Sequence, residues 1–331
     1  MTEPDPVLLE QRYRSVLRIL PASYRVERED EMVAAFMEMS GEVPDERNPR
    51  PRWDEVASVV ALAVRVRLGG AGAGPRFVAW GEAVRLLALL GLGYQALLSL
   101  YSLLSIGLAA VLDAPGPAPW SRVVLAVVDC SWFAAYAVLM RGHVRPAKAA
   151  ALAGGATSLL ALLTGLPIDL MGWPQAASAL TVVATLLALL VGFHRDAPPV
   201  RRPWGAAVLP PALAAPLVVL PVVAFPPAAD PIVWLSLWIY PDGLAIVALL
   251  VTGAVALARH RSPSVLLALA MGGTLLMASR LPLGLPREYN EPVWTTSVTQ
   301  GALLAVMVVS LMVAGLRRLP AARRPGLEPA S

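Results

Sequence analysis

Three charged residues lie within or beside apolar stretches of this chain, and their types and positions make them the best candidates for chemistry. Asp129 and Asp242 each interrupt a hydrophobic run, and Arg280 lies near the end of another. An ionised side chain in hydrocarbon is costly unless it is paired or reaches water, so such residues usually have a partner or a function. We therefore predict that Arg280 lies near one or both aspartates, in a pocket within the outer half of a membrane.

Two interpretations of these three residues stay open from the sequence. In the first, they form an ion pair that packs helices together and binds nothing. In the second, they form a binding site in which Arg280 matches an anionic group of a substrate or signal.

Most other kinds of reactive site have no counterpart in the sequence. Lys148 is the only lysine and no glycine-rich loop precedes it, so the chain is not a P-loop ATPase. No His-Glu-x-x-His or Gly-x-Ser-x-Gly pattern occurs, and Cys130 is the only cysteine. The three histidines fall at predicted helix ends, where contact with solvent is expected: His143, His194 and His260. We therefore expect no enzymatic activity, no metal site and no cofactor.

The composition indicates that lipid is part of the solvent of this protein. Of the 331 residues, 57% are hydrophobic and 15% are charged, and the mean hydropathy is +0.63. Apolar runs long enough to span a bilayer begin at about residue 86. We expect an all-α protein with about eight transmembrane helices, at residues 86–112, 122–140, 149–168, 174–193, 205–225, 234–258, 263–283 and 293–316.

The basic residues between these segments predict an orientation. Twelve of them fall on one side of the predicted membrane, whereas the opposite side has Arg122, Arg280 and Arg287. Because cytosolic loops carry the excess of basic residues, both termini are expected in the cytosol. The excess of arginine over lysine is typical of a GC-rich bacterial genome, so we expect a multi-pass protein of the bacterial cell membrane.

The segments outside the predicted membrane domain (residues 86–316) differ in charge. Residues 1–70 should form a cytosolic helical domain, 71–85 a linker with an interfacial helix, and 317–331 a basic cytosolic tail. The whole chain has a net charge of +4, yet residues 1–75 carry ten arginines against thirteen acidic residues, a net charge of −3. The N-terminal domain is therefore not expected to bind nucleic acid.

Three amphipathic helices are predicted in the N-terminal domain, at about residues 7–20, 23–40 and 54–68. The apolar face of the first has the residues Leu9, Tyr13, Val16, Leu17 and Leu20, and that of the second Met32, Ala35, Phe36 and Met39. The third is apolar from Val56 to Val64, which is too short to span a bilayer. It is either a core helix or a helix of the membrane interface.

The N-terminal residues carry a resemblance to a known family. Arg12-Tyr13-Arg14, Leu17-Arg18-Ile19-Leu20-Pro21, Tyr24-Arg25, Glu27-Arg28 and Glu31-Met32 resemble the permease prefix domain. The resemblance covers about residues 8–68, and the whole chain looks like a multi-pass membrane protein of actinobacteria. It implies a small cytosolic helical module preceding the membrane part of a transport-related protein.

Two patterns in the membrane domain are each open to two interpretations. A series of residues recurs in the same order in the two halves, which is either a duplication of four helices or chance. The residues are Trp120, Asp129, His143, Pro146, Gly154-Gly155 and Leu166-Pro167, followed by Trp234, Asp242, His260, Pro263, Gly272-Gly273 and Leu281-Pro282. Prolines also recur every five residues from Pro211 to Pro231. They predict a broken helix that either lines a substrate path or serves structure alone.

Two functional hypotheses follow. The first is a permease or a permease subunit, in which the N-terminal domain docks a cytosolic protein partner. The alternative is a membrane-embedded sensor or regulatory scaffold that signals through this domain. In both, the lipid bilayer is a partner of the chain.

Overall fold

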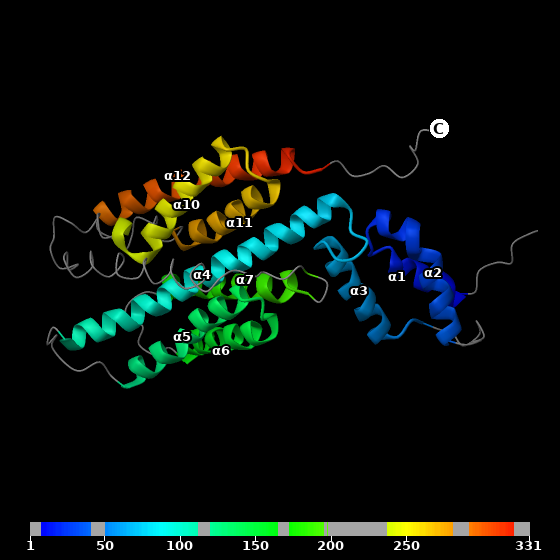
Figure 1. The fold of residues 1–331 in the computed structure, drawn as a ribbon, viewed down its shortest axis with the longest axis horizontal. Helices are drawn as coiled ribbons and strands as arrows, with labels where there is room; N and C mark the ends of the chain where they lie inside the picture. Colours follow the sequence, from blue (N-terminus) through cyan, green and yellow to red (C-terminus); the bar gives the residue numbers. More distant parts are fainter. Residues whose placement is uncertain are drawn as a thin grey trace, which may run out of the picture. The chain divides into compact units, whose positions relative to one another are not determined.

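A computed structural model describes residues 8–40, 50–111, 120–164, 172–194, 197, 237–280 and 291–320. All regular secondary structure in these ranges is helical (Figure 1). The chain divides into two compact units. Unit 1 comprises residues 1–82, 194–197 and 319–331, and unit 2 comprises residues 83–193 and 198–318. The first division therefore falls within residues 71–85, where the sequence predicts a connection between domains.

Unit 1 contains the helices α1 (Leu8–Leu17), α2 (Ala22–Ser40) and α3 (Trp53–Arg67). Their bounds agree with the predicted helices to within a few residues. Each helix is short and buries one apolar face against the other two, so the three depend on one another for stability. The core consists of Leu9, Tyr13, Leu17, Leu20, Val33, Phe36, Val59 and Ala63.

The predicted buried face of α2 is wrong in part. Phe36 is buried and stacks on Tyr13, with ring centroids 3.9 Å apart and the planes 6° from parallel. Met39, however, is 82% exposed, and Ala35 is exposed as well. Val33 takes their place in the core.

The acidic residues of α2 help to explain which of its faces is buried. Arg14 of α1 forms ion pairs with Asp30 at 3.0 Å and with Glu29 at 3.8 Å. Val33 lies one helical turn after these carboxylates and therefore on the face that is turned toward α1. Glu29 and Asp30 thus contribute to the contact between the two helices.

Helix α3 has two apolar faces. Val59 and Ala63 belong to the core, which agrees with the interpretation of α3 as a core helix. On the other face Trp53 is 87% exposed, Val60 42% and Val64 40%. Residues 53, 60 and 64 lie on one side of a helix because their spacings of seven and four are close to whole turns.

Glycine is required where α3 connects to the next helix. Gly69 has φ +80°, a conformation that residues with a Cβ rarely adopt. At Gly81 an added Cβ would lie only 1.9 Å from the carbonyl oxygen of Leu68. Both positions allow the backbone after α3 to approach the first turns of the following helix.

The described residues of unit 2 contain most of α4 and six further helices. They are α4 (Pro75–Val111), α5 (Trp120–Met140), α6 (Val144–Thr164), α7 (Gly172–Gly192), α10 (Pro241–Ala258), α11 (Pro263–Arg280) and α12 (Glu291–Arg317). Each predicted membrane segment overlaps one of these helices except 205–225, which lies outside the described residues together with the prolines from Pro211 to Pro231. Helix α4 begins at Pro75, so residues 75–85 of the predicted linker are the start of α4.

Three helices in the described ranges are long and apolar enough to cross a membrane. They cover Pro75–Leu104, Pro241–Ala258 and Val293–Arg317. Shorter apolar helical stretches cover Ala126–Met140, Ala179–Gly192 and Pro263–Ala278. The protein is therefore membrane-embedded by the length and composition of its helices, and the count of eight spans stays a prediction.

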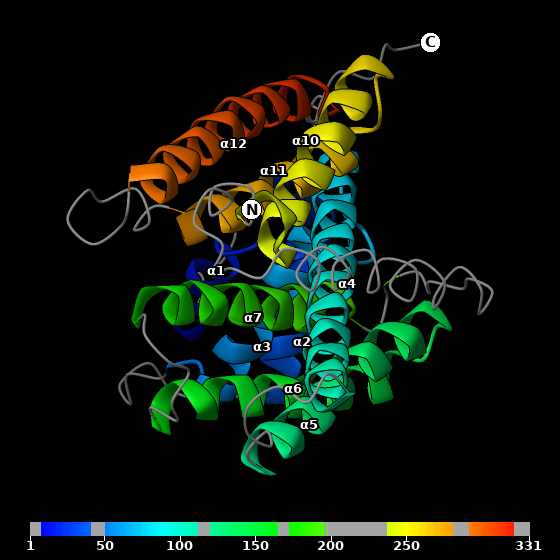
Figure 2. The same cartoon turned by 90° about the vertical axis from the view of Figure 1, so that its left-hand side faces the viewer.

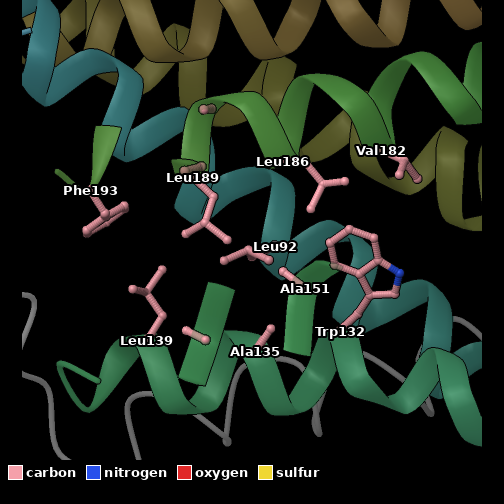
Figure 3. Packing of buried hydrophobic residues seen from close by; sticks show 12 residues of the cluster. Leu92, Trp132, Ala135, Leu139, Ala151, Val182, Leu186, Leu189 and Phe193 are labelled. Carbon is pink, nitrogen blue, oxygen red and sulfur yellow. The ribbon is translucent and has the colours of Figure 1, made fainter. Parts of the chain in front are cut away.

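Within unit 2 the helices pack in two groups (Figures 1 and 2). Helices α4 to α7 surround a core in which Leu92, Trp132, Leu139 and Leu189 point toward one another (Figure 3). Helices α10, α11 and α12 form the second group, with Ile246, Leu266, Leu304 and Leu311 buried between them. Helix α7 contacts α11 and so joins the groups.

The hairpins α5–α6 and α10–α11 share several local features. The turn of each has a residue with positive φ, 91° at Gly142 and 47° at His260. In α6, a Cβ at Gly155 would lie 2.6 Å from a Leu186 atom of α7, and in α11 a Cβ at Gly273 would lie 2.7 Å from a Val308 atom of α12. These parallels are features that a duplication would produce, and the duplication itself stays a prediction.

The single lysine caps a helix. Lys148 Nζ donates to the carbonyl oxygens of Leu190 at 3.0 Å and Phe193 at 2.8 Å, at the C-terminal end of α7. The last carbonyls of a helix have no partner within it, and a cation there also meets the negative end of the helix dipole.

Replacement of Lys148 by methionine should therefore destabilise unit 2 by about 1–2 kcal/mol, as loss of a charged cap does. Thermal unfolding of the purified protein in detergent measures the effect. Arg145→Met is the matched control, because Arg145 is an exposed cation in the first turn of the same helix. Equal unfolding temperatures for the two variants would contradict the capping role.

Candidate functional site in the membrane unit

The hairpin of α10 and α11 places two of the three candidate residues at one end. Each helix has 18 residues, and the turn between them covers residues 259–262. Asp242 is the second residue of α10 and Arg280 is the last residue of α11. Because antiparallel helices of equal length end at the same level, both side chains lie at the end opposite the turn.

Asp242, Arg280 and Tyr94 form a cluster, which we call the polar triad. Arg280 Nη2 lies 3.9 Å from Asp242 Oδ2, and the Tyr94 hydroxyl donates a hydrogen bond to Asp242 Oδ1. The triad joins α4 to the hairpin, so it connects residues 148 positions apart in the chain.

The burial of the two charged side chains is unequal. Arg280 is 6% exposed and Asp242 is 45% exposed. The distance of 3.9 Å is beyond hydrogen-bond range, and the buried Nε of Arg280 has no hydrogen-bond partner among the described residues. Arg280 is therefore a buried cation whose five donor positions are incompletely used, whereas Asp242 accepts a hydrogen bond at Oδ1 and is half-exposed.

A cavity of about 270 Å³ adjoins the triad, between α4, α7, α10 and α11. Its wall is mostly hydrocarbon, and it includes Leu87 and Tyr94 of α4, Thr185 of α7, Ala245 and Leu249 of α10, and Leu276 of α11.

The triad lies one helical turn beyond this cavity. Arg280 follows the lining residue Leu276 by four positions, and Asp242 precedes the lining residue Ala245 by three. Residues at these spacings share a helix face, so both charged side chains continue the wall of the cavity. Tyr94 belongs to the wall and to the triad. The site is thus an apolar chamber with a charged end.

Asp129 is placed apart from the other two candidates. Its Oδ1 accepts a hydrogen bond of 3.2 Å from Thr157 of α6, within the hairpin α5–α6. No ion pair among the described residues joins Asp129 to Arg280. Of the predicted cluster, the described structure therefore brings together Asp242 and Arg280, with Tyr94 as a third member.

Sequence reasoning did not single out Tyr94. A signal was present, because Tyr94 and Gln95 are adjacent polar side chains within an apolar run. Gln95 is also buried, and its Nε2 donates to Thr181 Oγ1 of α7 at 3.3 Å. Gln300 of α12 is a further buried polar residue, and its Nε2 donates to the carbonyl oxygen of Leu237 at 3.0 Å.

Comparisons of this chain with protein-family models, with curated proteins and with solved structures found no match. The resemblance of residues 8–68 to the permease prefix domain therefore stays a prediction.

Proposed function

We propose that this chain is a transport-related membrane protein, a permease or the membrane subunit of one, and that its solute site is the chamber closed by the polar triad. The observation that carries the proposal is the incompletely bonded, 6% exposed guanidinium of Arg280 at the end of a cavity between four helices. Ionisable residues within membrane helices usually mark substrate or ion pathways, because burying a charge is costly.

Two further features support this function. The chamber lies between the two groups of helices in unit 2, and binding sites of many transporters lie between structural repeats. Unit 1 has its own core. In this proposal it docks a cytosolic partner, which would supply any nucleotide hydrolysis.

The proposed orientation places both termini in the cytosol of a bacterial cell and the triad near the outer face of the membrane. Arg259 and Arg261 lie in the turn at the opposite end of the hairpin, which is the basic and therefore inner end.

Reporter fusions check this orientation. Fusions at Gly116, Gly172 and Gly284 should report the outside, whereas fusions at Pro199 and Ser331 should report the inside. One position that reports the opposite side would show that a span between it and its neighbours is miscounted.

Proteoliposomes that contain the purified full-length protein test transport. They are loaded with a panel of radiolabelled organic anions, from short water-soluble acids to decanoate, and efflux is compared with that from protein-free vesicles. We expect protein-dependent efflux of at least one anion, and loss of it in Arg280→Gln. Arg259→Gln is the control, because Arg259 is an exposed arginine at the inner end. If no anion moves, a permease that carries organic anions without a cytosolic partner is rejected, and the sensor is favoured.

A further inference from the structure

We propose that the chamber binds a single-chain anionic amphiphile, with its alkyl chain in the cavity and its head group on Arg280. The proposal rests on the proposed function in so far as it names the class of solute that the permease would carry. The binding site itself is argued from the lining, size and charged end of the cavity.

The residues that line the cavity favour a ligand with an apolar body. Thr185 and Thr252 lie in the wall, yet their hydroxyls donate to the carbonyl oxygens of Thr181 at 2.7 Å and Ala248 at 2.6 Å in their own helices. The Tyr94 hydroxyl donates to Asp242. These hydroxyl hydrogens are therefore used within the protein, and an acceptor group placed beside them would lose its bonds to water without replacement.

The volume of the cavity matches a single alkyl chain. Its volume of about 270 Å³ is just below the range of about 300–1,000 Å³ that is typical of ligand pockets. At about 30 Å³ for a group the size of a water molecule, it holds roughly nine such groups. An alkyl chain of about eight to ten carbons fits this space, whereas the two chains of a membrane phospholipid do not.

The charged end selects the head group. The buried hydrogen-bonding capacity that remains there belongs to a donor, since the Nε of Arg280 has no partner among the described residues, whereas the carboxylate of Asp242 is 45% exposed and can bond to water. A head group must therefore supply acceptor oxygens, and a carboxylate or phosphate matches a guanidinium best. Because Asp242 is 45% exposed, this end of the chamber is accessible at the surface of the unit.

Radiolabelled decanoate tests the site in full-length protein reconstituted in phosphatidylcholine nanodiscs, with empty nanodiscs as the background. We expect saturable binding of one decanoate per chain and clearly weaker binding of decanol and of decyltrimethylammonium. In Arg280→Gln, decanoate affinity should fall by about tenfold or more, since a charge-assisted hydrogen bond is lost. Decanol affinity should not change in that variant.

The alkyl subsite is tested by filling the cavity. Gly272 lines it, and a Cβ there would lie 3.9 Å from its nearest neighbour, so Gly272→Leu adds volume without meeting backbone. This variant should lose decanoate binding. Gly301→Leu is the matched control, since a Cβ at Gly301 meets no described atom within 4 Å and Gly301 does not line the cavity. If Gly272→Leu fails to fold, Ala248→Leu fills the same space from the wall of α10.

Several outcomes overturn the proposal: no saturable binding to the folded wild type, equal affinities for decanoate and decanol, or wild-type affinity in a folded cavity-filling variant. The result is also separable from the transport assay. Decanoate binding without any transport would reject a permease that works without a cytosolic partner and leave the site. Transport of another anion without decanoate binding would reject the amphiphile and leave the permease.

Discussion

Replacement of Phe36 by alanine should destabilise unit 1 by about 3–5 kcal/mol, which is usual for truncation of a buried aromatic residue. Phe36 is 3% exposed, and its ring stacks on Tyr13, so the change removes apolar burial and the ring contact together. A three-helix unit of this size has little stability in reserve, because a small domain buries a small share of its surface. We therefore expect Phe36→Ala to be largely unfolded at room temperature.

Circular dichroism of residues 1–82, with unfolding by heat and urea, measures this effect. The wild-type segment should be helical and marginally stable. Met39→Ala is the matched control, since Met39 is on the same helix but is 82% exposed, and its replacement should change stability by less than about 0.5 kcal/mol. If Met39→Ala lowered stability as much as Phe36→Ala, the buried face assigned to α2 above would be wrong.

Neutralising Asp242 and neutralising Arg280 should lower the stability of unit 2 by unequal amounts. Asp242→Asn leaves Arg280 as a buried cation without its counter-charge, and we expect a loss of about 3 kcal/mol, near the lower limit for a broken buried pair because Asp242 is half-exposed. Arg280→Gln instead leaves a half-exposed carboxylate that still accepts from Tyr94. That change should cost about 1 kcal/mol or less.

Thermal unfolding of the full-length protein in nanodiscs distinguishes the two variants. The double variant Asp242→Asn with Arg280→Gln should be more stable than Asp242→Asn alone, since no buried charge remains in it. Additive losses in the double variant would show that Asp242 and Arg280 do not interact. The small effect expected for Arg280→Gln also allows its binding and transport defects to be measured on a folded protein.

Much of the local structure could be predicted from hydropathy and helix signals. The three helices of unit 1 begin and end within a few residues of the predicted bounds, and the predicted segment 263–283 begins at Pro263, the first residue of α11. The predicted segment 234–258, in contrast, begins seven residues before α10, which starts at Pro241. These features depend on residues that are close in sequence, which a pattern can report. The eight-span count and the orientation depend on the membrane and stay predictions.

Only the part of the candidate site that lies within one hairpin could be predicted from the sequence. Asp242 and Arg280 meet because two helices of equal length are joined by a short turn, so their approach follows from distances along the chain. Asp129 is on a different hairpin, and nothing in its charge or depth could show that its partner would be Thr157. The prediction that Arg280 lies near one or both aspartates therefore holds for one of them.

The sequence by itself determined a helical, membrane-embedded chain with a charged N-terminal segment, because helix formation and hydropathy are sums over neighbouring residues. Only the tertiary structure decided which face of α2 is buried and that Tyr94 bonds to Asp242 across 148 positions. The tertiary structure also decided that four helices line one cavity. Such features depend on how helices rotate against one another, and that rotation follows from contacts between residues far apart in the chain.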